Sequence, residues 1–127
     1  FHNYFDRAEN AFVSAYRKYI SDNEFEVVVE YLASPRLDGK TLLLVDPMLA
    51  TGISADLSYR ALLTKGTPAK TVLACVIASQ QAIDYALSHF PDDTIIYCAA
   101  IDPILNEHAY IVPGLGDAGD LCFGEKE

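Results

Sequence analysis

The amino-acid sequence predicts an α/β fold: a doubly wound, mainly parallel sheet flanked by helices, with a long loop near its C-terminal end. Several short runs are continuously apolar, which is typical of strands buried on both faces of a parallel sheet. Two amphipathic helix patterns separate the last three of these runs. The resulting order, β-α-β-α-β, is that of doubly wound sheets, and a length of 127 residues suits one domain rather than two.

Five runs are predicted to be strands, at residues 11–19, 25–32, 41–46, 71–78 and 94–101. The polar segment 18–24 lies between the first two and predicts a mobile loop. After residue 101 the chain changes character, with two Pro, three Gly and three Asp in residues 102–120 around a short strand at 110–112. Because long loops in compact domains are more often functional than idle, this segment is expected to have a function.

Two helices are predicted between the last three strands. The first spans 54–65, with Gly66 just beyond its end and Pro68 following, and its buried stripe is expected to contain Leu57, Ala61 and Leu62. The second follows Ser79 as N-cap and is stopped by Pro91. Its buried face is expected to contain Ala82, Ile83, Ala86, Leu87 and Phe90.

Composition excludes several classes of function. Hydrophobic residues make up 51% of the chain, and 9 Lys and Arg face 18 Asp and Glu, a net charge of -9. This charge has the wrong sign for a protein that grips nucleic acid through its phosphates. No stretch approaches the roughly 20 apolar residues of a membrane span, and none resembles a secretory signal, so we expect a cytoplasmic protein without a membrane partner.

The cysteines and histidines predict no metal site and no Cys-His catalytic pair. Cys75, Cys98 and Cys122 are far apart, without metal-type spacing, and are expected to be free and mostly buried. The histidines, at positions 2, 89 and 108, are equally scattered.

The strand at 41–46 leads directly into the first helix through a loop that suits a phosphate. A helix N-terminus offers unpaired N–H groups and a partial positive charge, Gly52 permits a tight turn, and Thr51 and Ser54 supply hydroxyls. Asp46, at the strand's end, is expected to accept hydrogen bonds from vicinal sugar hydroxyls. Phosphate and diol together imply a ribose 5-phosphate. Taken alone, the same residues also suit an ordinary β–α turn.

The string VDPMLATGIS, at 45–54, resembles the binding motif for 5-phosphoribosyl 1-diphosphate (PRPP) in phosphoribosyltransferases, in the form carried by the uracil enzymes. Most relatives that use other bases have two successive acidic residues at the positions of Asp46 and Pro47. The chain departs from the uracil enzymes at Ile53, where they usually have a second glycine. The resemblance implies a catalytic Asp46 and a PRPP site formed by Asp46, Pro47, Met48, Leu49, Ala50, Thr51, Gly52, Ile53 and Ser54.

The segment YIVPGLGDAGD, at 110–120, resembles the uracil-binding segment of the same family. The resemblance implies that Ile111, Gly116, Asp117 and Ala118 bind uracil, largely through main-chain atoms, and that Asp117 also binds PRPP and takes part in catalysis. Backbone N–H, C=O and N–H groups match the acceptor, donor and acceptor on one edge of uracil. Taken alone, the segment also suits an ordered surface loop with aspartate caps.

Further similarity at 11–17, 99–102 and 105–107 extends the match over essentially the whole chain. Arg17 matches a PRPP-binding arginine of the family and is expected to pair with the diphosphate, although alone it resembles an ordinary cation at a strand end. The family's amino-terminal portion, which completes the diphosphate site, is expected before Phe1. The chain therefore resembles the carboxy-terminal catalytic portion, a single domain with a phosphoribosyltransferase-like Rossmann-type fold.

The activity implied by the resemblance is transfer of the phosphoribosyl group from PRPP to uracil, giving UMP and diphosphate. Mg²⁺ is expected with PRPP, without dedicated protein ligands, and the family's habits imply a homo-oligomer and GTP as a possible activator. The alternative is a non-catalytic or regulatory domain, such as a pyrimidine sensor or the tail of a uridine kinase. Intact Asp46, Thr51, Gly52 and Asp117 favour the enzyme.

Overall fold

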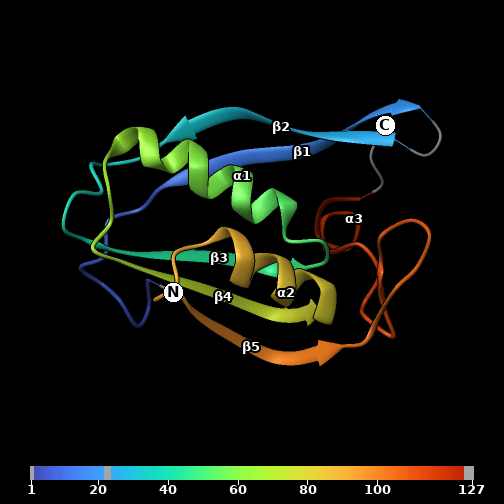
Figure 1. Ribbon diagram of the computed structural model, residues 1–127. Coiled ribbons are helices and arrows are strands. Elements are labelled where there is room, and N and C mark those ends of the chain that lie inside the picture. Colours follow the sequence, from blue (N-terminus) through green and yellow to red (C-terminus); the bar gives the residue numbers. More distant parts are fainter. Residues whose placement is uncertain (1, 22–23, 125–127) are drawn as a thin grey trace.

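The computed structural model describes residues 2–21 and 24–124, with the main chain alone for 16–21 and 24–28. At its centre is a three-stranded sheet in the order β3-β4-β5. Its strands are Thr41–Leu49, Lys70–Ser79 and Ile95–Asp102, connected by helices α1 (Ile53–Leu62) and α2 (Gln80–His89). The predicted β-α-β-α-β order and α/β fold are confirmed (Figure 1).

All three central strands are parallel. Strand β3 pairs with β4 from Thr41 to Leu49, and β4 pairs with β5 from Val72 to Ser79. Their carboxyl ends therefore meet at one edge of the sheet. The β3–α1 loop and the segment that follows β5 both lie on this edge (Figure 1), which is where α/β sheets bind ligands.

The hydrophobic core lies between the sheet and its two helices. Leu73 in β4, Leu62 in α1 and Ala82 and Ala86 in α2 are almost completely buried and belong to one cluster. The opposite face of the sheet is more open in the described part of the chain, since Val45, Val76 and Tyr97 are each about half exposed or more. Burial on both faces, expected from the apolar runs, is therefore confirmed only for the face that the helices cover.

Helix α1 begins one residue before its predicted start and continues as a 3-10 turn, Leu63–Lys65, up to Gly66. The predicted buried stripe is correct at Leu62, but Leu57 and Ala61 are only half-buried. The buried face is instead centred on Ala55 and Tyr59. The reason is that α1 packs against a hairpin of β1 (Phe12–Ser21) and β2 (Glu24–Ala33) as well as the sheet (Figure 1), so a different side of the helix is buried.

Helix α2 starts as predicted, with Ser79 as its N-cap. Ala82, Ala86 and Phe90 are buried as expected, and the Phe90 ring lies 4.9 Å from the Tyr59 ring of α1. Leu87, by contrast, is 63% exposed, so its predicted place in the core is wrong. A narrow stripe of small alanines suffices here because the helix packs closely on β4.

The first two strands form a separate antiparallel hairpin, β1 (Phe12–Ser21) and β2 (Glu24–Ala33). The predicted mobile loop at 18–24 is wrong, because Tyr19 pairs with Phe25 and Ser21 with Glu24. Residues 22–23 of that prediction lie outside the described residues. Strands joined by so short a connection must be antiparallel. Polar composition misled the prediction because a two-stranded ribbon away from the central sheet does not require an apolar run.

The C-terminal segment contains more structure than expected. Strands β6 (Ile104–Leu105) and β7 (Ile111–Val112) form a small antiparallel pair. They are followed by a six-residue helix that was not predicted, α3 (Ala118–Phe123).

The three cysteines are free, as predicted, but only partly buried: Cys75 and Cys98 are half-buried and Cys122 is exposed. Among the described residues, no helix is long and apolar enough to cross a membrane.

Candidate functional site

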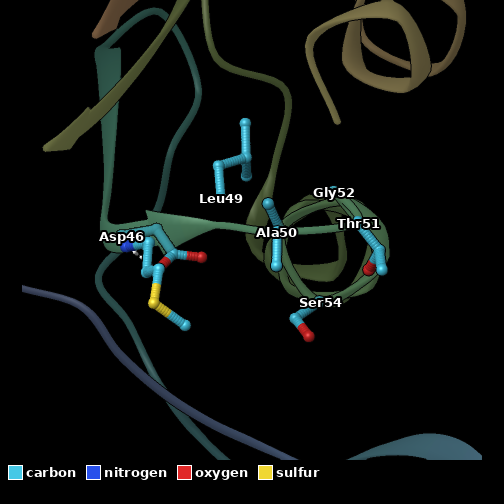
Figure 2. A pocket seen from close by; sticks show the side chains of 8 residues that line it. Asp46, Leu49, Ala50, Thr51, Gly52 and Ser54 are labelled. Atoms are coloured by element: carbon cyan, nitrogen blue, oxygen red, sulfur yellow. Dashed lines mark hydrogen bonds between the residues drawn. The ribbon is translucent and has the colours of Figure 1, made fainter. Parts of the chain in front are cut away.

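The β3–α1 loop encloses a small cavity at the carboxyl edge of the sheet (Figure 2). Its volume is about 50 Å³, so it suits a single small group such as a phosphate. Except for Ala55, its lining belongs to the predicted segment: Asp46, Met48, Leu49, Ala50, Thr51, Gly52 and Ser54. Pro47 and Ile53, also predicted to bind PRPP, do not line it.

Gly52 is the N-cap of α1 and has a left-handed backbone conformation, with φ 80°. Helix α2 lies directly behind it, because a Cβ atom added at Gly52 would be 3.0 Å from Cδ1 of Tyr85 and 3.2 Å from the carbonyl oxygen of Ala82. Both the conformation and the close approach require glycine. The tight turn expected at this position is therefore confirmed.

The start of α1 is open to an anion. No side chain caps the helix at Gly52 within the described residues. The N–H of Asp56 makes the first intrahelical hydrogen bond, to the Gly52 carbonyl at 3.0 Å, and the N–H of Ile53 makes a long contact of 3.4 Å with Thr51 Oγ1. The first turn thus directs N–H groups and the positive end of the helix dipole towards the cavity.

Asp46 lies in the cavity wall, although β3 continues for three residues beyond it and does not end there as predicted. Its Oδ1 accepts a hydrogen bond of 2.9 Å from the N–H of Met48, which fixes the carboxylate relative to the loop. Burial raises the pKa of Asp46, and the bond from Met48 opposes that rise. Asp46 is therefore a half-buried acid in the wall of the same cavity as the first turn of α1.

The Ser79 hydroxyl joins the β3–α1 loop to the start of helix α2 by hydrogen bonds. It donates to the carbonyl of Ala50 at 2.6 Å and accepts from the N–H of Ala82 at 2.9 Å, and the side chain is buried. Sequence reasoning identified Ser79 as a helix cap but missed its bond to Ala50. That bond depends on the register of β3 and β4, which places Leu49 beside Ala78.

The predicted base-binding segment is held in place by Asp102, whose Oδ2 accepts a hydrogen bond of 3.1 Å from the N–H of Gly114. Gly114 has φ 53°, and a Cβ there would lie 2.0 Å from the Ile111 carbonyl oxygen. The Ile111 residue is only 3% exposed, so its side chain anchors the segment. The family resemblance includes Asp102 but does not imply this role for it.

Asp117 is the N-cap of α3, and its Oδ1 accepts hydrogen bonds from the N–H groups of Gly119 and Asp120 at 2.8 and 3.0 Å. The structure thus gives Asp117 the capping function that sequence reasoning allowed as the alternative to catalysis. Ala118 is the first residue of α3, and Gly116 has φ 85° with open space around it. The roles of these three residues towards uracil and PRPP stay predictions.

Arg17 belongs to β1, where its backbone is paired with Val27. Its side chain lies outside what the structure describes, so its expected contact with diphosphate also stays a prediction.

Comparison with known proteins agrees with the two motifs. A family model described as uracil phosphoribosyltransferase matches residues 6–125. The chain belongs to the uracil phosphoribosyltransferase family.

Curated relatives of the family have similar sequences over most of this chain. The uracil phosphoribosyltransferase of Porphyromonas gingivalis is 60% identical over 126 residues, which cover 99% of this chain and 58% of that protein. The one of Methanothermobacter thermautotrophicus is 40% identical over 120 residues, 94% of this chain and 54% of its own length. The chain therefore spans little more than half the length of these relatives.

A solved structure supports the fold. The AQ2163 protein from Aquifex aeolicus matches with a TM-score of 0.86 and 30% sequence identity, over 97% of this chain and 57% of that one. The loop at 46–54 and the segment at 110–120 are thus placed on a uracil phosphoribosyltransferase framework, at the carboxyl edge of its sheet (Figure 1).

Proposed function

We propose that the protein transfers the 5-phosphoribosyl group of PRPP to uracil, giving UMP and diphosphate. The observation that carries the proposal is the small cavity at the uncapped start of α1, with Asp46 in its wall. Family membership supports the same activity. The rival function, a non-catalytic regulatory domain, would not require the phosphate loop and its acid to be kept, and here Asp46, Thr51 and Gly52 line one cavity.

In the proposed reaction the 5-phosphate binds at the N–H groups of the first turn of α1, and Asp46 accepts hydrogen bonds from the ribose hydroxyls. Displacement at C1 of PRPP passes through an oxocarbenium-like state, so catalysis rests on positioning the base and on charge at the ring and the leaving group. Main-chain groups near Ile111 and Gly116 hold uracil and stabilise the anion that forms as its N1 proton passes to water or to the departing diphosphate. Asp117 acts near the ribose or diphosphate.

Mg²⁺ is part of this proposal and supplies positive charge to the diphosphate. Within the described residues, no group of three or more His, Cys, Asp or Glu side chains is placed to hold a metal. We propose that the ion is bound mainly by substrate phosphates and water, with few carboxylates. Asp46 and Asp117 are the acids proposed to lie near it.

On the family resemblance alone, we extend the proposal to a cytoplasmic homo-oligomer that GTP activates. No described residue is assigned to an effector site.

The proposed activity is tested with labelled bases. The intact protein, supplied with PRPP and Mg²⁺, is expected to convert labelled uracil to UMP and to leave cytosine and hypoxanthine unchanged. Equal turnover of all three bases would contradict the assigned substrate, and failure to form UMP would support the regulatory alternative.

Changing Ile111 to valine is expected to preserve base selectivity. Its side chain is buried and anchors the segment, while the groups proposed to read uracil belong to the main chain. Ile111→Val removes one methylene and leaves those groups in place, so uracil should still be preferred to cytosine by a factor on the order of 10⁴. Competition between the two bases at equal concentration measures this ratio. If the variant accepts cytosine, readout by the backbone is wrong.

Substitutions of Asp117 are expected to separate its charge from its capping function. Asn caps a helix about as well as Asp, whereas Ala loses about 1 kcal/mol of stability. We therefore expect Asp117→Asn to keep the thermal midpoint near that of the wild type but to lower kcat about tenfold, with little change in the KM for uracil. Asp117→Ala should lose both stability and turnover. Wild-type kcat in the Asn variant would show that Asp117 serves the structure alone.

A further inference from the structure

An acidic residue in the first turn of α1 is almost completely buried beside the proposed phosphate site. Asp56 is 3% exposed, and both of its carboxylate oxygens are engaged. Oδ1 accepts a hydrogen bond of 2.9 Å from Nε of Arg60, one turn later in α1, and Oδ2 accepts one of 3.2 Å from the hydroxyl of Tyr85 in α2. The hydrogen bond from Tyr85 therefore links the two helices at the base of the loop.

The ring of Tyr85 is itself fixed in place. Its Cδ1 would be 3.0 Å from a Cβ at Gly52, so the ring lies directly against the loop. Its other neighbour is His89, whose ring stacks on it with centroids 3.8 Å apart and an angle of 10° between the planes. Burial, and then the negative charge of Asp56, raise the pKa of Tyr85, so its hydroxyl stays protonated and donates at neutral pH.

The two bonds to Asp56 determine what its charge can do. A carboxylate in the first turn of a helix is attracted by the same N–H groups and dipole that attract a bound anion. If Oδ2 lost the hydrogen bond from Tyr85, that oxygen would turn towards those groups or face the phosphate without a hydrogen-bond donor of its own. With Arg60 and Tyr85 in place, the carboxylate is held away from the cavity, and the N–H groups remain for the ligand.

We propose that Tyr85 is a positioning residue for the ligand's phosphate, acting through its contact with Gly52 and its hydrogen bond to Asp56. Its ring supports the turn from behind, and its hydroxyl restrains the acid that would otherwise compete with the phosphate. The inference rests on the proposed binding of PRPP at residues 46–54, and it adds a residue of α2 that contacts no substrate.

The test removes the hydroxyl alone. Tyr85→Phe keeps the ring against Gly52, so the variant is expected to fold, and Tyr4→Phe is the matched control because Tyr4 is 89% exposed. Ribose 5-phosphate binding is measured by titration calorimetry on the intact protein, together with the KM values for PRPP and uracil and the thermal midpoint. We expect Tyr85→Phe to weaken ribose 5-phosphate binding and raise the KM for PRPP about fivefold to tenfold. The KM for uracil should change less than twofold, and Tyr4→Phe should behave like the wild type.

A second substitution shows whether Asp56 carries the effect. In an Asp56→Asn background the competing charge is absent, so removing the Tyr85 hydroxyl is expected to change ribose 5-phosphate affinity less than twofold. An undiminished effect there would overturn the proposed route through Asp56. Unchanged affinity in Tyr85→Phe, with or without a lower thermal midpoint, would overturn the positioning role, as would a wild-type protein that fails to bind ribose 5-phosphate.

The same experiment separates this inference from the proposed function. If the wild type forms no UMP but ribose 5-phosphate binding still depends on Tyr85, the transferase proposal fails and the positioning role stands. If UMP forms and binding does not depend on Tyr85, the reverse holds.

Discussion

Gly52→Ala is expected to abolish most of the activity, with a fall in kcat/KM for PRPP of about 100-fold, or about 2.7 kcal/mol. The new methyl group would meet the Tyr85 ring at 3.0 Å and the Ala82 carbonyl at 3.2 Å, on a backbone with φ 80°. The turn must then move away from α2, which displaces the N–H groups of the first turn. Stability should fall by about 2–4 kcal/mol, from the left-handed conformation and the overpacking together. Steady-state kinetics and thermal unfolding of one preparation measure both effects.

Gly39→Ala is the matched control for this substitution. Gly39 also has a positive φ, 72°, but a Cβ there would have no neighbour within 4 Å. It should therefore lose only the conformational part, about 1–2 kcal/mol, and keep wild-type kinetics in its folded fraction. If both glycine variants lose stability equally and Gly52→Ala keeps its KM for PRPP, the loop's close approach to α2 has no role in binding.

Asp46→Asn is expected to lower kcat/KM at least tenfold, which corresponds to about 1.4 kcal/mol or more. The change removes the charge that is proposed to hold the ribose hydroxyls, while an amide oxygen can still accept the hydrogen bond from Met48. Asp92→Asn, at an exposed position, controls for the change in net charge. Wild-type kinetics in Asp46→Asn would eliminate its assigned role.

Asp46→Asn is also expected to change how the stability of the protein depends on pH. Because burial raises the pKa of Asp46 in the folded protein, the ionised form is disfavoured there relative to the unfolded chain, whose aspartates have a pKa of about 3.9. The stabilising contribution of the protonated acid is fully present below that value and is lost as the pH rises through the folded-state pKa. At neutral pH, the thermal midpoint of Asp46→Asn should therefore equal or exceed that of the wild type. Any difference in stability between the variant and the wild type should disappear in acid, and thermal midpoints over a pH series measure it.

The conformation of the β3–α1 loop was predictable because all its determinants are local. A strand, an acid, a glycine and a helix start follow one another within nine residues, and the structure folds this segment around one cavity. The network behind it was not predictable. Tyr85 and Ser79 reach the loop only because β3 and β4 lie side by side and α2 packs against α1, and these are contacts between residues about 30 positions apart.

The errors in the fold have similar physical causes. Residues 18–21 form strand because the two strands of a hairpin satisfy each other's backbone hydrogen bonds. Leu87 is exposed because a stripe of alanines already fills the space under α2. Helix α3 was overlooked because it is short and contains a glycine, although Asp117 before it is a recognisable N-cap.

Amide NMR of the intact, ¹⁵N-labelled protein tests most directly whether PRPP binds at the start of α1. On titration with PRPP and Mg²⁺, we expect the largest shift changes at the N–H groups of Thr51, Gly52, Ile53, Ser54 and Ala55, with smaller changes at Gly116 and Ala118. Uracil added alone should leave the first group nearly unchanged. Saturable shifts elsewhere on the protein, with those of residues 51–55 unaltered, would contradict the assignment of this loop as the PRPP site.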